Sequence, residues 1–201
     1  MRCRTARGTR ESDCTPFDPK PTPGYEAWRW TVRSLREALA TRGWRATDRN
    51  NLPLVVDPSS NLAVIVTSGD TGTGLTDGEP KTRYPKGPQT RRCIRVNRKQ
   101  LLLWDSDGQD LVPTPNEDEM TTWMLVVCAA PILDPQSRQV VGTQARCELS
   151  LPAAIDEEGY VDEWAERIIL PTVRIESEGT DPITAAEAFD EVEVDVAWRN
   201  R

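Results

Sequence analysis

Residues 52–67 read LPLVVDPSSNLAVIVT, two runs of apolar and β-branched residues around a polar centre. β-branched residues favour strands, whereas Asp, Pro, Ser and Asn favour turns. The pattern therefore predicts a β-hairpin with strands at 52–56 and 62–67. We expect this hairpin to belong to a mainly antiparallel sheet.

Two other stretches have the residue spacing of helices. From Tyr25 to about Arg42 the apolar residues recur at helical intervals, and Gly43 follows where a helix commonly ends. Residues 90–104 hold apolar side chains among many arginines, and Pro88 suits the first turn of a helix. We predict a basic helix there, with a strand as the alternative.

The second half of the chain predicts further strands. Residues 121–129 form a continuous apolar run typical of a buried central strand, and residues 140–151 can pair with it. A short helical segment at 161–167 precedes a strand that Pro171 closes, and an alternating edge strand follows at 192–196. Together these elements predict an α+β fold with a mainly antiparallel sheet and with helices packed on one face.

Composition divides the chain into three parts. Residues 1–24 are basic and proline-rich with almost no apolar residue, so we expect a disordered, flexible arm. Residues 25–172 form the predicted α+β domain, and residues 173–201 form an acidic C-terminal segment with the edge strand. The net charge of -7 is polarised, because residues 1–110 hold 19 Lys and Arg against 13 Asp and Glu, whereas residues 148–201 hold 4 against 15. Such polarity bears on partners rather than on the fold.

Missing residue types narrow the classes of function. The sequence has no histidine, which removes the commonest general base and every Ser-His or Cys-His nucleophile. Its five cysteines lack C-x-x-C spacing, which argues against a disulfide framework and a zinc site. No run of 18 apolar residues and no signal-peptide pattern is present, so we expect a cytoplasmic protein without membrane contact. We expect binding rather than catalysis, and we assign no catalytic residue, metal ion or cofactor.

The long segment 68–88, SGDTGTGLTDGEPKTRYPKGP, directly follows the second strand of the hairpin and exceeds an ordinary connection. Its five glycines allow positive φ angles and exposed N–H groups, and its Thr, Lys and Arg side chains supply donors for an anion. The spacing matches neither G-x-G-x-x-G nor the Walker lysine motif. The segment is therefore a Gly/Pro-rich candidate anion loop without a known signature. The alternative is a surface loop that binds nothing.

Basic residues continue from the loop into the second predicted helix. Residues 81–99 contain eight Lys and Arg and no acidic residue, which suits a phosphate backbone or an acidic protein. A solvated helix face is the alternative. The residues that we assign to ligand or partner binding are Ser68, Gly69, Asp70, Thr71, Gly72, Lys81, Arg83, Lys86, Arg91, Arg92 and Arg95.

Five segments resemble uncharacterised small proteins of bacterial prophages and integrative mobile elements. They are TSGDTG at 67–72, PKT at 80–82, YPKGP at 84–88, ELSLP at 148–152 and WAERIILP at 164–171. The resemblance assigns no activity to any residue. It implies a context, since small proteins on such elements often regulate, counter or supplement host defence.

Three hypotheses of function follow from the sequence. The first is a non-catalytic protein of a mobile element that binds a nucleic-acid-handling or host-defence complex, through protein or nucleic acid contacts, with the loop and the basic segment. The second is an enzyme or sensor that binds a nucleotide or phosphate ligand, with Asp70 or Glu79 as metal or acid/base partner and Lys81 or Lys86 on the phosphate. The third is a structural subunit of a phage or of a larger assembly.

Overall fold

The computed structural model describes Thr15, residues 17–107 and residues 120–176, which form one sheet and two helices. In chain order the elements are α1 (Thr22–Ala40), β1 (Arg45–Arg49), β2 (Leu52–Asp57), β3 (Leu62–Ser68), α2 (Pro88–Asp107), β4 (Thr121–Leu133), β5 (Val140–Ala154), β6 (Glu163–Ile169) and β7 (Val173–Glu176). The α+β class, the mainly antiparallel sheet and the hairpin of β2 and β3 are confirmed. The helix predicted at residues 90–104 is also confirmed, by α2.

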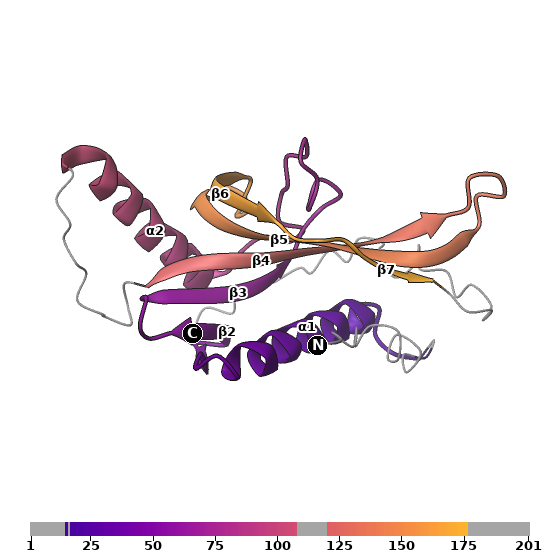
Figure 1. Cartoon of the computed structure of the whole chain (residues 1–201), viewed down its shortest axis with the longest axis horizontal. Coiled ribbons are helices and arrows are strands. Elements are labelled where there is room, and N and C mark those ends of the chain that lie inside the picture. The colour runs from indigo at the N-terminus through magenta and orange to yellow at the C-terminus, as the bar shows by residue number, and fades with distance from the viewer. Residues whose placement is uncertain (1–14, 16, 108–119, 177–201) are drawn as a thin grey trace, which may run out of the picture.

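The sheet has the strand order β1-β2-β3-β4-β5-β6, and β7 pairs with β5 beyond the end of β6. Neighbouring strands are antiparallel except β3 and β4, which are parallel. The long loop and α2 make the crossover between these two strands (Figure 1). The end of β3 therefore lies beside the middle of β4, where Ser68 is paired with Val127.

The hydrophobic core lies on the side of the sheet that faces α2. Side chains alternate between the two faces of a strand, so every second residue of β2, β3 and β4 points into this core. Ile94 of α2 and Val161, which precedes β6, complete it. The buried members are Leu54, Val56, Ala63, Ile65, Ile94, Met120, Met124, Val126 and Val161.

The opposite face of the sheet also carries buried residues. Val55 and Val64 oppose each other across β2 and β3 and are both buried outside this core. α1 packs against β1, β2 and β3 with Val32 as its buried residue, whereas α2 packs against β4 and β5. The sequence predicted both helices on one face, but they divide between the two faces. The reason is that β2 and β3 bury consecutive residues and so need cover on both sides.

The helical segment predicted at 161–167 is wrong, because this region forms β6. Pro152 of β5 pairs with Trp164 while Leu151 pairs with Glu166, so β6 has a β-bulge at this point. The bulge adds one residue and brings Trp164 and Arg167 to the same side of the strand. Their spacing of three residues is also that of one face of a helix.

Two strands were not predicted. β1 is charged and mostly exposed, so it has no apolar alternation and depends on its pairing with β2. β7 lies in the part that we assigned to the acidic C-terminal segment. The predicted edge strand at 192–196 and residues 1–14 of the predicted arm lie outside the described residues, whereas α1 already begins at Thr22.

Within the described ranges, neither helix is long and apolar enough to cross a lipid bilayer.

Candidate functional site

The loop between β3 and α2 is held against the sheet at both of its ends. Gly69 and Thr82 form an antiparallel bridge, and the Arg83 N–H donates to the Ser68 carbonyl at 2.9 Å. The Thr82 N–H donates to the Val161 carbonyl at 2.9 Å, and the Val161 N–H donates to the Thr82 hydroxyl at 3.0 Å. The loop therefore starts and ends as a short extension of the sheet.

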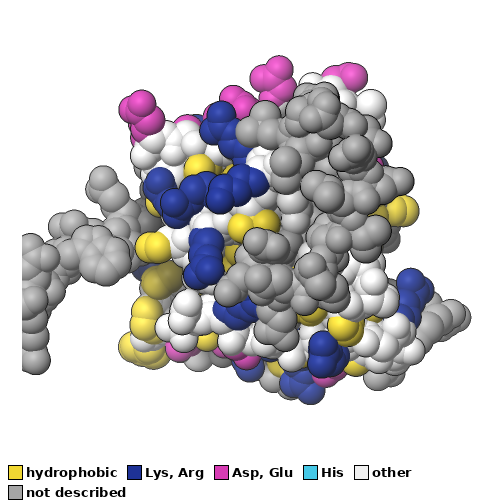
Figure 2. Space-filling model, turned by 90° about the vertical axis from the view of Figure 1, so that its left-hand side faces the viewer, with side chains coloured by type: hydrophobic (Ala, Val, Ile, Leu, Met, Phe, Trp, Pro, Cys, Tyr) yellow, Lys and Arg dark blue, Asp and Glu magenta, His cyan; other side chains and the backbone are white. Residues whose placement is uncertain are grey.

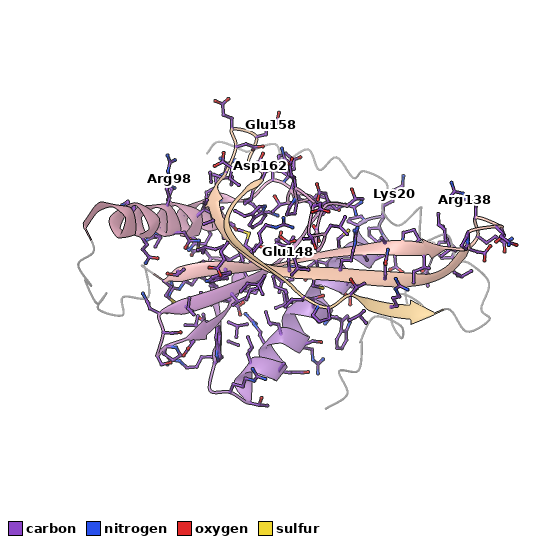
Figure 3. All side chains as sticks on the ribbon, turned by 45° about the horizontal axis from the view of Figure 1, so that its top comes forward. Lys20, Arg98, Arg138, Glu148, Glu158 and Asp162 are labelled. Atoms are coloured by element: carbon purple, nitrogen blue, oxygen red, sulfur yellow. The ribbon has the colours of Figure 1, made fainter. Side chains whose placement is uncertain are left out.

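Glu148 of β5 is fully buried and binds the loop through its carboxylate, at the centre of the sheet in Figure 3. Oε2 accepts hydrogen bonds from the Gly74 N–H and from Arg167, both at 2.8 Å, and Oε1 accepts from the Ser150 hydroxyl at 2.7 Å. Burial alone would raise the pKa of Glu148, but the bonds from Arg167, Gly74 and Ser150 outweigh it and leave this pKa below its usual value. The carboxylate is therefore charged at neutral pH.

Two side chains of β6 extend this attachment. Arg167 donates to the carbonyls of Gly78 and Leu75 at 2.7 and 3.2 Å, and the Trp164 indole N–H donates to the Pro80 carbonyl at 2.7 Å. These bonds satisfy carbonyls of a segment that has no helix or strand of its own. The loop is thus ordered by residues more than sixty positions away, which the sequence analysis did not connect with it.

Lys81 belongs to an ion-pair cluster within the protein. Its Nζ lies 2.9 Å from Asp156 and 3.9 Å from Asp162, and it sits over the ring of Tyr160. The hydrogen bond between Lys81 and Asp156 raises the pKa of Lys81 and lowers the pKa of Asp156. Asp162 and the neighbouring Glu158 lie in the turn region between β5 and β6, away from the sheet (Figure 3). The positive charge of Lys81 is therefore already compensated by carboxylates.

The loop glycines serve close packing more than unusual backbone angles. Of the five glycines in the loop, only Gly74 has a positive φ, at +70°. A Cβ atom on Gly69 would overlap the hydroxyl of Thr73 and the side chain of Val126. The loop lies so close to β4 that this position leaves no room for a side chain.

We expect Gly69→Ala to lower the free energy of unfolding by about 1 to 3 kcal/mol, because the new methyl group must displace buried neighbours. Gly87→Ala is the matched control, since a Cβ at Gly87 meets no heavy atom within 4 Å. The control should change stability by less than about 0.5 kcal/mol. Urea unfolding of both variants measures the difference, and equal stability of the two would contradict tight packing at Gly69.

A split in the sheet opens beside the loop. β2 pairs with β3 only through residues 55–57, so the beginning of β2 separates from the end of β3. Pro53 has no N–H with which to continue the ladder. The Val66 carbonyl, which would otherwise face β2, accepts a hydrogen bond from the Trp28 indole of α1 at 3.2 Å. The separated strands leave a space that neither of them fills.

A cavity of about 470 Å³ occupies this split. It lies between the starts of α1 and β2 on one side and the C-terminal ends of β3 and of the loop on the other. Volumes of this size are typical of sites for small molecules. Three cationic side chains line it, and none of the described lining residues is Asp or Glu. Its other polar and aromatic lining residues include Tyr25, Trp28, Thr31, Asn51, Thr67, Ser68, Tyr84 and Thr90, and the cations are Lys20, Arg83 and Lys86.

Lys86 is the most constrained of these cations. It is partly buried, its N–H donates to the Gly159 carbonyl at 2.7 Å, and its Nζ donates to the Thr67 hydroxyl at 2.7 Å. Burial lowers the pKa of Lys86 to about 8. Unlike Lys81, it has a neutral hydroxyl as its hydrogen-bond acceptor. Lys86 is therefore still mostly charged at neutral pH, although its burial disfavours the charged form.

The structure separates the predicted site residues into three groups. Ser68, Gly69, Arg83 and Lys86 line the cavity. The second group forms hydrogen bonds within the protein and consists of Asp70, Thr71, Gly72 and Lys81. The Gly72 N–H donates to Asp70 Oδ1, Arg146 donates to the Thr71 carbonyl, and Lys81 donates to Asp156. The third group is Arg91, Arg92 and Arg95 on α2.

The analysis of the sequence missed several residues of the cavity. Lys20 lies in the segment assigned to the arm, and Trp28 lies in the helix predicted from Tyr25 to about Arg42. Tyr25 and Thr67 had no assigned role. They come together only because α1 crosses the split between β2 and β3, and no spacing in the sequence indicates that crossing.

The described part of α2 carries a basic face. Arg92, Arg95, Arg98 and Lys99 are exposed, and Arg98 points away from the sheet (Figure 3). Figure 2 views the molecule from the side where α2 projects in Figure 1. Lys and Arg side chains gather on this side, whereas Asp and Glu side chains lie mainly at its edges. Arg91 differs, because its Nε donates to the Lys86 carbonyl at 3.0 Å and its guanidinium packs against Gly159. It supports the loop instead of facing solvent.

No group of three or more Cys, Asp or Glu side chains suited to a metal ion occurs among the described residues. No protein-family model matches the sequence, and comparisons with curated proteins and with solved structures found no significant match. The resemblance to proteins of mobile elements therefore stays a prediction.

Proposed function

We propose that this protein binds a small anionic ligand in the cationic cavity, whose charged lining residues are Lys20, Arg83 and Lys86. One observation carries the proposal. The Lys86 ammonium is placed in a cavity of ligand size, and none of the described residues that line this cavity is Asp or Glu. Partly buried cations in proteins are usually paired with a carboxylate or with another anion.

The energetics favour an external anion as the missing partner. Desolvation lowers the pKa of Lys86, and an anion beside the amine would favour the charged form and restore it. Shifted pKa values in a cavity are typical of functional sites. Ligand binding would therefore be coupled to protonation of Lys86, and anion affinity should decrease as the pH rises through about 8.

The uncharged lining indicates the rest of the ligand. Tyr25 and Trp28 lie with their ring centroids 5.7 Å apart, and Tyr84 lines the same cavity. Aromatic walls suit a planar or apolar body. We therefore propose a ligand with an anionic head group, phosphate or carboxylate, on a ring or a short apolar chain.

The position of the cavity in the fold supports this proposal. The cavity touches Thr67, Ser68 and Gly69 at the end of β3, just where the chain leaves the parallel pair of β3 and β4. In sheets with parallel strands, ligands commonly bind outside the carboxyl ends of those strands.

Contact with nucleic acid through α2 is a second candidate function. It is favoured by the four exposed cations of the basic face, Arg92, Arg95, Arg98 and Lys99. Such a surface would neutralise phosphates without reading bases. A role in a nucleic-acid-handling or host-defence complex would use this surface rather than the cavity.

Calorimetric titration with phenyl phosphate and with benzoate tests the first proposal, because these probes join a ring to either head group. We expect at least one of them to bind, and Lys86→Met to weaken that binding about tenfold or more, as is usual for loss of a charged hydrogen bond. Arg138→Gln is the control, since Arg138 lies at the tip of the β4–β5 hairpin (Figure 3). It should leave binding unchanged.

The same variants distinguish the two candidates. If neither anion binds, or if Lys86→Met binds both like the wild type, the cavity is not an anion site. Binding of a single-stranded oligonucleotide that weakens in Arg95→Gln and Arg98→Gln would support the second candidate. Each lost phosphate contact should then reduce the salt dependence of log affinity by about 1.

A further inference from the structure

The chain has only four lysines, and they lie in different surroundings. Lys81 is paired with Asp156 and Asp162, whereas Lys99 is exposed on α2 and Lys20 is exposed at the start of α1. Lys86 alone is partly buried in the cavity and bonded to a hydroxyl. Its Nζ is therefore held in one place, next to a space into which a ligand fits.

We propose that Lys86 forms a covalent imine with a small anionic carbonyl compound, an aldehyde or α-keto acid, whose charged group lies against Arg83 and Lys20. The proposal rests on the proposed function, because the anionic head group brings the carbonyl carbon to the amine. It adds that the ligand is held by a bond and not by charge alone. All three side chains line the same cavity.

The chemistry needs no further reactant. The lone pair of the neutral Lys86 amine attacks the carbonyl carbon, so that a C–N bond forms, the second C–O bond of the carbonyl breaks, and one proton passes from nitrogen to oxygen. The resulting carbinolamine then loses its hydroxyl group as water, which takes the remaining nitrogen proton, and a C=N bond forms. One amine and one carbonyl thus give one imine and one water, and nothing is oxidised or reduced.

The environment of Lys86 suits a nucleophile. Desolvated lysines are the ones that form imines, because a larger share of the amine is neutral. With a pKa of about 8, about half of the Lys86 amines are neutral at pH 8. The Thr67 hydroxyl, itself buried, positions Nζ through the 2.7 Å hydrogen bond. The charged and titratable groups that share the cavity with Lys86 are Lys20, Tyr25, Arg83, Tyr84 and Cys128.

Reductive trapping with glyoxylate and cyanoborohydride on the full-length chain tests the proposal, with each lysine quantified by peptide mass spectrometry. We expect the reduced adduct at Lys86 to form at least about tenfold faster than at Lys81, whose pKa is raised by its hydrogen bond to Asp156. Lys99, which is exposed on α2 away from the cavity, is the control in the same sample. The rate at Lys86 should rise with pH around a midpoint near 8.

Lys86→Arg keeps the positive charge but cannot form an imine, so it should retain anion binding and lose the adduct. Labelling of Lys86 no faster than Lys99, while phenyl phosphate or benzoate still binds, would overturn the imine and leave the anion site standing. Neutral acetaldehyde gives the reverse control. If it labels Lys86 as fast as glyoxylate does, the lysine is a nucleophile, but the cavity does not select anions, and the anionic ligand of the proposal fails.

Discussion

Glu148→Gln should lower the free energy of unfolding by about 3 kcal/mol, the scale observed when one partner of a buried ion pair is removed. The amide leaves Arg167 without its carboxylate and places an N–H donor against the donors of Gly74, Ser150 or Arg167. Urea unfolding measures the change. Limited proteolysis within residues 70–80 should also become faster, because the attachment of the loop to β5 is weakened.

Glu166→Gln is the control for this variant, since Glu166 is an exposed carboxylate on the neighbouring strand β6. It should alter stability by less than about 0.5 kcal/mol. In the wild type, the contribution of the charged Glu148 to the free energy of unfolding should be lost as the pH falls from 4.5, the ordinary pKa of a Glu carboxyl, through the lower pKa of Glu148 in the folded state. The reason is that the folded state binds a proton at Glu148 less tightly than the unfolded state does. If Glu148→Gln were as stable as the wild type, the ion pair of Glu148 and Arg167 would not hold the loop.

Lys86→Met should have the opposite effect and raise the free energy of unfolding at pH 7 by about 1 to 3 kcal/mol. Folding lowers the pKa of Lys86 from 10.5 to about 8, and each pKa unit corresponds to about 1.4 kcal/mol of penalty on the charged form. Methionine has a similar length without the charge, although the hydrogen bond to Thr67 is lost. A residue that destabilises the fold is expected where a site serves binding.

The pH dependence identifies the cause of this gain. Between pH 8 and pH 10.5 the unfolded chain holds the Lys86 proton while the folded chain releases it, so wild-type stability receives a rising contribution over this window. The advantage of Lys86→Met should therefore be full below pH 8 and disappear towards pH 10.5. Lys99→Met, at an exposed position on α2, is the control and should show no such trend. A variant less stable than the wild type at pH 7 would refute the desolvation argument.

The sequence alone determined the elements whose stabilisation is mainly local. The apolar spacing from Tyr25, the β-branched runs of 52–67 and the apolar run from residue 121 predicted α1, the hairpin and β4. These patterns work because a helix or strand must bury one face, whatever it packs against. The basic character of residues 81–99 was also visible in the sequence, as were the length and the glycine content of the loop that follows β3.

The tertiary structure decided how those residues are used. Lys81 and Lys86 are five positions apart and looked equivalent, yet one meets Asp156 and the other a cavity without lining carboxylates among the described residues. A helical segment was predicted at 161–167, but the bulge of β6 places Trp164 and Arg167 on one side of a strand. The cavity exists because β2 and β3 separate and α1 crosses their split. The burial of a side chain and the charges beside it depend on residues that are distant in the sequence. They decide whether a lysine is paired or desolvated, and therefore how its pKa shifts, which the residue type alone does not show.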